Sequence, residues 1–393
     1  MKALALSIAL AAGCSWSQFS DLSNSTWVHG QEAPDSDQSD YAVGIVNVAG
    51  ADSPGELAVL SGAPANYSTL SFDATGSTNE TLTETLGNFS ISTLSTHPVF
   101  IGDDAGNVAM VDKGVDGTLV TVHGTSGQLT YSQLSSTDPA DAATYATTAT
   151  SAPIIVTSAG STPTSAKPNA WLVESTVTNC ALVEDGMPMA AAALASDGTT
   201  VWAYTRTGDL VGYTIAALTT GCIDSQSPPP LSGTTIAKTG VPAANGGYLA
   251  LVGTQFAIAV AYDSASTSTG MVSVVDLTNM TVVGAPLPMS GVQSAAFGTF
   301  GTMPALALGF PSRTVGTTTD VGQVELHVVD TTTGAIDGDV AELLDIPQAD
   351  GNLVFGRALA AMTYNGATIL AVAASNEVYA YYETMLYSDT RQQ

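Results

Sequence analysis

The chain has 393 residues, of which 45% are hydrophobic, 11% are charged and 7% are aromatic. This balance is that of a folded globular protein and excludes an intrinsically disordered chain. Eight Lys and Arg against 35 Asp and Glu give a formal net charge of −27, which repels polyphosphates, so we expect no nucleic acid partner. The length suits either a few ordinary domains or one domain built from repeats.

Residues 1–13 have the order of a secretory signal sequence. Lys2 is followed by an apolar stretch over residues 3–12 and then by small side chains, which matches the charged, hydrophobic and cleavage regions of such a signal. The apolar stretch is too short to span a bilayer. We therefore expect residues 1–13 to be a signal peptide that is removed from the mature protein.

The signal ends in Leu10-Ala11-Ala12-Gly13-Cys14, and small residues directly before a cysteine resemble the lipobox of bacterial lipoproteins. The resemblance implies that Cys14 becomes the lipid-modified first residue of the mature chain. Ser15 follows it instead of an aspartate, and by resemblance to enterobacterial sorting this implies a lipid anchor in the outer membrane, with the protein periplasmic or surface-exposed. The alternative is an ordinary secretory signal followed by a cysteine without a special role.

Residues 14–40 are polar and show little periodicity, so we expect a flexible tether between the anchor and a folded domain at residues 41–388. Asp35, Asp37 and Asp40 are spaced along the tether, but no glycine turn or closing glutamate completes a calcium loop. These acids are therefore expected to be solvated and to bind no metal.

With Cys14 lipid-modified, Cys180 and Cys222 remain as a pair. In an oxidising compartment a disulfide is the default state of such a pair, and no Cys-x-x-Cys or Cys/His cluster competes for it. We expect a Cys180–Cys222 disulfide. Two unpaired buried thiols are the alternative.

From residue 41 onward the apolar residues occur in short runs rich in Val, Ile, Leu, Thr, Tyr and Ala, separated by Gly, Asp, Asn, Ser and Pro. This pattern predicts strands and turns, and helical periodicity is scarce. The alanine-rich stretch from Met189 to Ala195 runs into a hairpin signal, so we interpret it as a strand as well. The clearest strands are Ala42 to Val48, Gly106 to Lys113, Gly117 to His123, Thr199 to Thr205, Gly208 to Thr214, Gln255 to Tyr262, Gly270 to Leu277, Gly322 to Asp330, Ala367 to Ala374 and Glu377 to Tyr382.

The strands recur in groups of four. One group runs from Asn88 to His123, a second from Gly247 to Ala285 and a third from Val292 to Leu344, while a last group begins at Asn352. Four strands in about 40 to 60 residues are typical of β-propeller blades. We therefore predict an all-β fold, a propeller of about seven four-stranded blades, with six or eight blades as alternatives. In the low-complexity stretch from Thr137 to Asn169, the strands of the third blade cannot be recognised from the sequence pattern.

Two segments near the C-terminus resemble the FG-GAP repeat of integrin α-subunit propellers. The later one holds Phe355-Gly356 and the earlier one holds Phe297-Gly298 followed by Gly309-Phe310-Pro311. The resemblance implies that the Phe of each motif lies between neighbouring blades and that its Gly lets strands approach closely. It also implies that Gly309 and Pro311 turn the chain out of the second strand of a blade.

Integrin-type blades often carry an Asp-x-Asp-x-Asp-Gly calcium hairpin, and this sequence has none. The nearest matches, Asp103-Asp104 and Asp337-Gly338-Asp339, are interpreted as ordinary hairpin turns. Ring closure has two candidates, because either Thr26 to His29 or Glu383 to Ser388 could complete the sheet of the terminal blade.

Motifs for catalysis are missing from the sequence. Gly-x-Ser-x-Gly and the glycine-rich nucleotide motifs do not occur, and His29, His97, His123 and His327 are scattered without metal-ligand spacing. Paired carboxylates for glycoside cleavage are not visible from sequence among so many acids. We expect no catalytic residue, no metal and no cofactor.

Basic residues are rare and therefore informative. Arg206, Arg313 and Arg357 stand among acids, so each either anchors an anionic ligand at a propeller face or forms a local ion pair. The leading prediction is a non-catalytic, lipid-anchored propeller that binds a protein or a glycan at the cell envelope. The alternatives are a propeller enzyme with its site at the axial channel, either polysaccharide-cleaving or quinoprotein-like, and a scaffold for envelope assembly.

Overall fold

The computed structural model describes residues 179–223, 230–263, 270–344, 354–364, 367–374 and 378–382 continuously, and between residues 28 and 172 it describes strands only. Helical structure within this described part is limited to one turn, α1 (Ile215–Ala217), and the turn that follows it, η2 (Leu218–Ile223). The remaining elements are strands, so the predicted all-β class is confirmed.

The strands form separate sheets of consecutive strands, most of them four-stranded. All neighbours on the main path of each sheet are antiparallel, as the tight connections require. The first half of the chain contributes β2 (Gly44–Asn47), β3 (Glu56–Ser61), β4 (Asn66–Phe72) and β5 (Thr78–Thr85); β6 (Val99–Gly102), β7 (Val108–Asp112), β8 (Thr118–Val122) and β9 (Leu129–Gln133); and β10 (Ala142–Thr147), β11 (Ile154–Ser158), β12 (Asn169–Leu172), β13 (Asn179–Glu184) and β14 (Met187–Pro188), the last sheet being joined by β18 (Leu231–Ser232).

The second half continues the pattern. Its sheets are β15 (Ala191–Ser196), β16 (Thr200–Thr205), β17 (Asp209–Thr214) and β19 (Thr234–Lys238); β20 (Gly247–Val252), β21 (Phe256–Ala261), β22 (Met271–Asp276) and β23 (Thr281–Pro288); β24 (Ser294–Phe300), β25 (Met303–Phe310), β26 (Gln323–Val328) and β27 (Glu342–Leu344); and β28 (Ala358–Tyr364), β29 (Ala367–Ala373), β30 (Val378–Tyr382) and β1 (Val28–His29).

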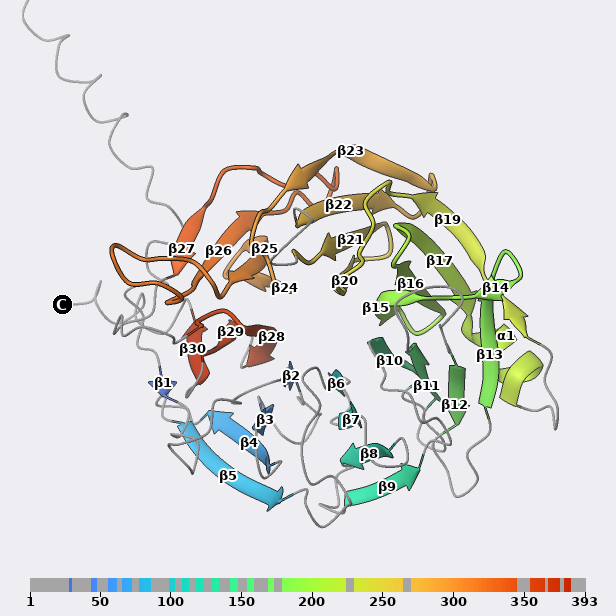
Figure 1. Cartoon of the computed structure of the whole chain (residues 1–393), viewed down its shortest axis with the longest axis horizontal. Coiled ribbons are helices and arrows are strands. Elements are labelled where there is room, and N and C mark those ends of the chain that lie inside the picture. Colours follow the sequence, from blue (N-terminus) through green and yellow to red (C-terminus); the bar gives the residue numbers. More distant parts are fainter. Residues whose placement is uncertain are drawn as a thin grey trace, which may run out of the picture.

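The sheets are arranged in a ring (Figure 1). The first strand of each sheet contacts the first strand of the next, so that β2, β6, β10, β15, β20, β24 and β28 follow one another and β28 meets β2 again. These strands line the inside of the ring, and the fourth strand of each sheet lies at its outside. A ring of radially arranged antiparallel sheets is the architecture of a β-propeller.

Both faces of a sheet are buried between its neighbours. In β25, Ala305 and Ala307 pack into one hydrophobic cluster, while Leu306 and Leu308 pack into another on the opposite side. This alternation follows from the two-residue period of a strand. It explains why the predicted strands are nearly continuous apolar runs and do not alternate between polar and apolar residues.

The predicted strands are found close to their expected bounds. The group from Gly247 to Ala285 corresponds to β20–β23, and the group from Val292 to Leu344 to β24–β27. The earlier group is shifted, because its sheet takes β9 as the fourth strand, and the predicted strand Asn88 to Leu94 lies outside the described residues. The low-complexity stretch from Thr137 to Asn169 holds β10 and β11, and the residues of β11 are buried.

The ring is closed by strands from the two ends of the chain. β1 pairs antiparallel with β30, with Val28 opposite Ala380 and His29 opposite Tyr379. Of the two candidates for closure, this is the early one, Thr26 to His29. It also means that residues 28–29, which fall within the predicted tether 14–40, belong to a sheet.

We expect deletion of residues 15–38 to lower the melting temperature, because β30 then loses its outer partner and presents an unpaired edge. Deletion of residues 15–26, which leaves β1 in place, should leave the melting temperature unchanged. Thermal unfolding followed by circular dichroism measures both. Equal melting temperatures for the two deletions would show that β1 adds no stability.

The connections between strands define two faces of the ring. The upper face is formed by the connections from the second to the third strand of each sheet and by the segments that join one sheet to the next. The lower face carries the connections from first to second and from third to fourth strand. Because neighbouring strands are antiparallel, the two kinds of connection lie at opposite ends of each sheet.

Candidate binding face

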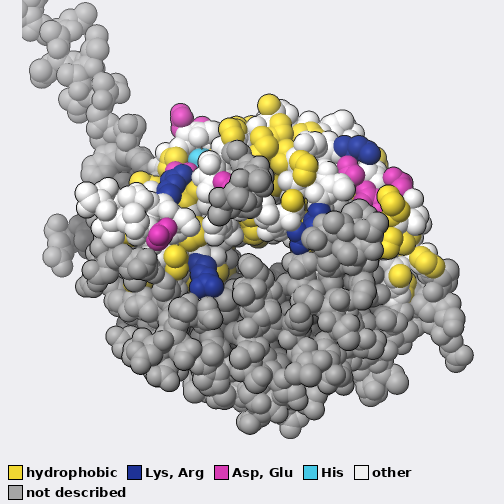
Figure 2. Space-filling view, viewed as in Figure 1, with side chains coloured by type: hydrophobic (Ala, Val, Ile, Leu, Met, Phe, Trp, Pro, Cys, Tyr) yellow, Lys and Arg dark blue, Asp and Glu magenta, His cyan; other side chains and the backbone are white. Residues whose placement is uncertain are grey.

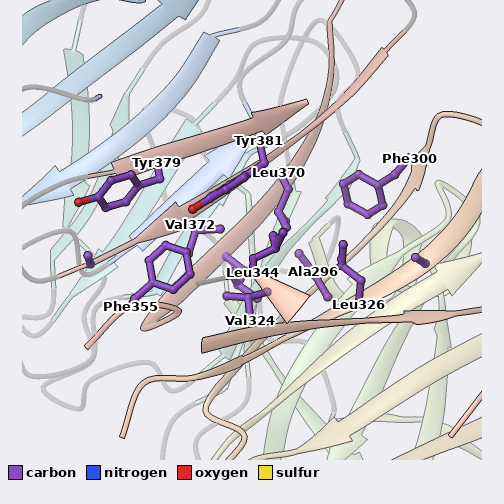
Figure 3. Packing of buried hydrophobic residues seen from close by; sticks show 14 of the residues in the cluster. Ala296, Phe300, Val324, Leu326, Leu344, Phe355, Leu370, Val372, Tyr379 and Tyr381 are labelled. Carbon is purple, nitrogen blue, oxygen red and sulfur yellow. The ribbon is translucent and has the colours of Figure 1, made fainter. Parts of the chain in front are cut away.

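Phe355 lies between two neighbouring sheets, as the motif resemblance implies. Its side chain is fully buried, and its ring meets the rings of Tyr379 and Tyr381 edge to face at 5.7 and 6.2 Å between centroids. The cluster around it takes residues from β24–β27 on one side and from β28–β30 on the other (Figure 3). Phe355 therefore joins the last two sheets through their side chains.

Gly356 of the later motif and Gly309 of the earlier one allow the backbones of these two sheets to touch. Gly356 has φ +86°, a conformation that side chains with a Cβ rarely adopt. A Cβ at Gly309 would overlap the carbonyl oxygen of Gly356 and the Oγ of Ser294, which itself donates a hydrogen bond to that carbonyl at 2.6 Å. The implied close approach is therefore present at Gly309 and Gly356.

The earlier motif is less completely buried. Phe297 is partly buried and packs against the cluster between β20–β23 and β24–β27, and its backbone N–H donates to the Tyr248 hydroxyl at 2.9 Å. Gly298 would bring a Cβ to 3.0 Å from side-chain atoms of Ala361 and Thr368. Pro311 directly follows the end of β25, where the chain turns out of the second strand.

Arg313 is part of a polar cluster on the upper half of β25–β26. Its guanidinium forms an ion pair with Glu325 and lies 3.7 Å above the ring centre of Phe310. His327, whose side chain is buried, places Nε2 3.4 Å from the other Glu325 carboxylate oxygen and Nδ1 3.1 Å from the Asp337 backbone oxygen. The local ion pair, one of the two predicted roles, therefore holds for Arg313.

Burial raises the pKa of the Glu325 carboxyl, but hydrogen bonds from His327 and Arg313 and their charges outweigh it, so this pKa lies below its usual value. A carboxyl whose pKa is lowered by folding stabilises the fold above its unfolded pKa, near 4.3, and loses this contribution as the pH falls through the folded pKa. The Glu325 contribution is therefore present at neutral pH and absent in strong acid.

We expect Glu325→Gln to be less stable than wild type at pH 7 and the difference in unfolding free energy to shrink as the pH falls below about 4. Urea unfolding at a series of pH values measures this. Asp339→Asn serves as the control, since Asp339 is exposed and in the described part of the chain forms no ion pair. A difference for Glu325→Gln that is constant with pH would contradict the prediction.

All Lys and Arg residues of the described part of the chain lie at the upper face. Arg206 and Arg313 are in connections from second to third strand, Arg357 is in the segment that precedes β28, and Lys238 ends β19. Figure 2, which views the ring along its axis, shows Lys and Arg side chains on opposite sides of the central opening and nearer the rim.

Hydrogen bonds hold the backbones of Arg206 and Arg357. Arg206 donates its N–H to Ala190 at 2.7 Å and its Nη1 to the carbonyl oxygen of Ala244 at 2.5 Å. Arg357 directly precedes the innermost strand β28, and its N–H donates to Val354 and Ala373. The Arg357 side chain is half-buried, and no hydrogen bond or ion pair joins it to another residue within the described part.

Some predicted residues cannot be placed in the site. Cys14, His97, His123 and Asp103-Asp104 lie outside the described residues. Cys180 is buried in β13, which contacts η2, the turn that carries Cys222, but the side chain of Cys222 is not described. His29 lies in β1.

The aspartate turns of the lower face were not predicted as a set. Asp276 accepts from the N–H groups of Thr278 and Asn279, Asp330 from those of Thr332 and Thr333, and Asp197 from those of Thr199 and Thr200. Hydrogen bonds lower the pKa of all three carboxyls. For Asp197, burial raises the pKa, but the hydroxyl of Thr199 and the indole N–H of Trp202, with the two backbone N–H groups, outweigh it. For Asp330 the hydroxyl of Thr333 acts most strongly on the pKa, and for Asp276 the backbone N–H of Asn279. Asp337 makes the same kind of turn with the N–H of Asp339 at 3.0 Å, in agreement with the predicted hairpin role.

The recurring Val-Val-Asp-x-Thr sequence at Val274 to Thr278 and at Val328 to Thr332 was the signal available for two of these turns. Groups of His, Cys, Asp and Glu that could hold a metal ion were not found among the described residues. In the same part of the chain, no helix has the length and apolar character needed to cross a membrane.

Comparison with known proteins supports the fold alone. No protein-family model and no curated protein matches the chain. Among solved structures, the crystal structure of the WD40 β-propeller domain of Doa1 matches with a TM-score of 0.52 and 10% sequence identity, over 91% of this chain and 97% of that one. The chain is therefore similar in fold to a β-propeller.

Proposed function

We propose that the chain is a seven-bladed β-propeller lipoprotein that binds a partner at the cell envelope without catalysing a reaction. The ring of inner strands supports the blade count, since each of them begins one sheet. The burial of Phe355 and the contact between Gly309 and Gly356 support a relationship to FG-GAP repeats. The upper face, which holds all the described Lys and Arg residues, is the observation that carries the binding role.

The anchor rests on the signal sequence and Cys14. The proposal places the protein in the outer membrane, held by lipid on Cys14. The chain enters β1 from the lower face, because β1 runs antiparallel to β30, the third strand of its sheet. The segment that follows Cys14 therefore enters β1 at its lower end, and the proposal leaves the upper face to a partner.

The Cys180–Cys222 disulfide belongs to the same proposal, because it requires an oxidising compartment. The contact between β13 and η2 brings the two segments together. Intact mass of the protein purified without reductant should rise by two hydrogens when it is reduced. An unchanged mass would remove the disulfide.

A combined experiment tests anchoring, binding and catalysis. Cells expressing the wild-type chain should incorporate a labelled fatty acid into it, and Cys14→Ser should abolish the label. The purified protein is then incubated with panels of glycans and of envelope proteins, and both bound ligand and reaction products are measured. Binding without product supports the proposal. Turnover of a sugar polymer would establish the enzyme alternative in its place.

A further inference from the structure

Two tyrosines contact the backbone of the innermost strand β24. Tyr248 is in β20, the innermost strand of the preceding sheet, and its hydroxyl accepts the backbone N–H of Phe297 at 2.9 Å. Tyr262 directly follows β21, and its hydroxyl forms a hydrogen bond with the backbone of Ala295. Both tyrosines are half-buried and pack against the hydrophobic cluster between the two sheets. Two phenols from one sheet therefore meet the edge of the next sheet.

This edge of β24 carries carbonyl oxygens as well as N–H groups. β24 is the first strand of its sheet and pairs antiparallel with β25. In such a pair, alternate residues direct both backbone groups toward the partner strand, and the residues between them direct both groups away from it. The N–H of Phe297 meets Tyr248, so Phe297 and, two residues earlier, Ala295 are of the second kind. Their carbonyl oxygens therefore lie on the edge that lines the axial opening (Figure 1).

The two hydroxyls act as hydrogen-bond donors toward the opening. A phenol that accepts a hydrogen bond still has its own proton to donate, and within the described residues no group accepts the proton of Tyr248 or Tyr262. Burial raises the pKa of both hydroxyls, that of Tyr248 to about 12, so both keep their protons at neutral pH. The wall between β20 and β24 thus offers two hydroxyl donors beside two carbonyl acceptors.

This arrangement suits a row of hydroxyl groups better than a peptide strand. A strand that adds to a sheet edge uses the N–H groups of that edge, and those of Ala295 and Phe297 already donate to the tyrosines. A sugar hydroxyl both donates and accepts, so it can donate to a carbonyl oxygen and accept from a phenol. Asn245 and Gln293, both exposed, precede β20 and β24 at the upper end of the same wall, and their amides also donate and accept.

The charge of the chain disfavours an acidic sugar at this wall. The formal net charge is −27, and Asp263 directly follows Tyr262, so a carboxylate on the ligand would be repelled. We infer that the wall of the axial opening between β20 and β24 binds a neutral glycan, with the hydroxyls of Tyr248 and Tyr262 as donors and the carbonyl oxygens of Ala295 and Phe297 as acceptors. This inference deepens the proposed binding function and rests on it.

The test uses the full purified chain and isothermal titration calorimetry. The neutral probes are maltohexaose, cellohexaose and laminarihexaose, which differ in linkage. Hexagalacturonate is the acidic probe, and a short peptide of alternating Thr and Val is the strand-forming probe. We expect a neutral oligosaccharide to bind at least about tenfold more tightly than either of the other two probes. No binding of any neutral oligosaccharide, or a preference for hexagalacturonate or the peptide, would overturn the inference.

Tyr248→Phe and Tyr262→Phe each remove one hydroxyl donor from the wall. Each should weaken binding about fivefold, a change of about 1 kcal/mol, which is the net contribution of one neutral hydrogen bond. Tyr213→Phe is the matched control, because the Tyr213 hydroxyl is buried in a different sheet and donates to the carbonyl oxygen of Val183 at 3.0 Å. It loses a hydroxyl and some stability but should bind as wild type does. Equal losses for all three variants would remove the two tyrosines from the site.

A second measurement needs no variant and therefore holds even if a substitution prevents folding. The backbone amide signals of Ala295 and Phe297 in the NMR spectrum of the wild-type chain should shift as the bound oligosaccharide is titrated in. When a tyrosine hydroxyl donates to the sugar, the hydrogen bond that it accepts from the amide is polarised. The amide of Val282, in the outermost strand β23, should stay in place. Binding without a shift at Ala295 and Phe297 would place the glycan elsewhere.

The outcome separates this inference from the proposed function. Cleavage of the bound oligosaccharide would end the non-catalytic proposal, even if binding still depended on Tyr248 and Tyr262. Capture of an envelope protein by a chain that binds no neutral oligosaccharide would keep the proposed function and remove the inference.

Discussion

Phe355→Ala is expected to lower the free energy of unfolding by about 3–5 kcal/mol, the range for removing a fully buried aromatic side chain. Phe355 is 0% exposed, its ring contacts those of Tyr379 and Tyr381 in the last sheet, and its cluster includes Val324 from the sheet before it. Its loss leaves a cavity between two sheets that cannot collapse without moving both. Urea denaturation followed by tryptophan fluorescence measures the change.

Met280→Ala is the control for this variant. Met280 is 56% exposed, at a turn between β22 and β23, so its truncation should change the unfolding free energy by less than about 0.5 kcal/mol. If Phe355→Ala were as mild as Met280→Ala, the ring of Phe355 would not join the two sheets.

Gly322→Ala should destabilise the protein by about 2–4 kcal/mol, through overlap and backbone strain together. Gly322 has φ +84°, and a Cβ there would overlap the backbone of Phe355, with which Gly322 forms a parallel bridge between the two sheets. Because the obstacle is backbone and not the end of a flexible side chain, the strands must separate to make room. The midpoint of urea denaturation reports the loss.

Gly316→Ala isolates the steric part of this effect. Gly316 lies in the same connection, has φ +64° and has no atom within 4 Å of an added Cβ. It should therefore cost only the strain of a positive φ, about 1–2 kcal/mol. Equal losses at Gly322 and Gly316 would show that the close contact between the sheets adds nothing to the cost.

The sheet pattern was predictable where turn residues mark the ends of strands. The groups over β20–β23 and β24–β27 are divided by residues such as Gly253 and Asn279, which end strands for local reasons. The sheet that contains β10 and β11 was hidden, because its Ser, Thr and Ala residues have little periodicity. Ile154 and Val156 are nevertheless buried, since neighbouring sheets cover both of their faces.

The binding face was predictable only in part. The rarity of Arg206, Arg313 and Arg357 in an acidic chain singled them out, but that they share one face depends on the strand order of each sheet and on the ring. The contact of Arg313 with Glu325 joins the start of a long connection to the strand that follows it. Only the proximity of Glu325 and His327 was predictable, because side chains two residues apart lie on the same side of a strand.

The pairing of β1 with β30 also determines when the molecule can finish folding. Residues 28 and 380 are almost the full chain apart, and contacts of such separation form slowly because a long loop must close first. During folding the earlier sheets can assemble in turn, but the final sheet lacks a strand until both β1 and β30 are available. A truncated product therefore exposes an open sheet edge, which is a target for proteases and for aggregation. Closure of the ring therefore depends on the presence of both β1 and β30.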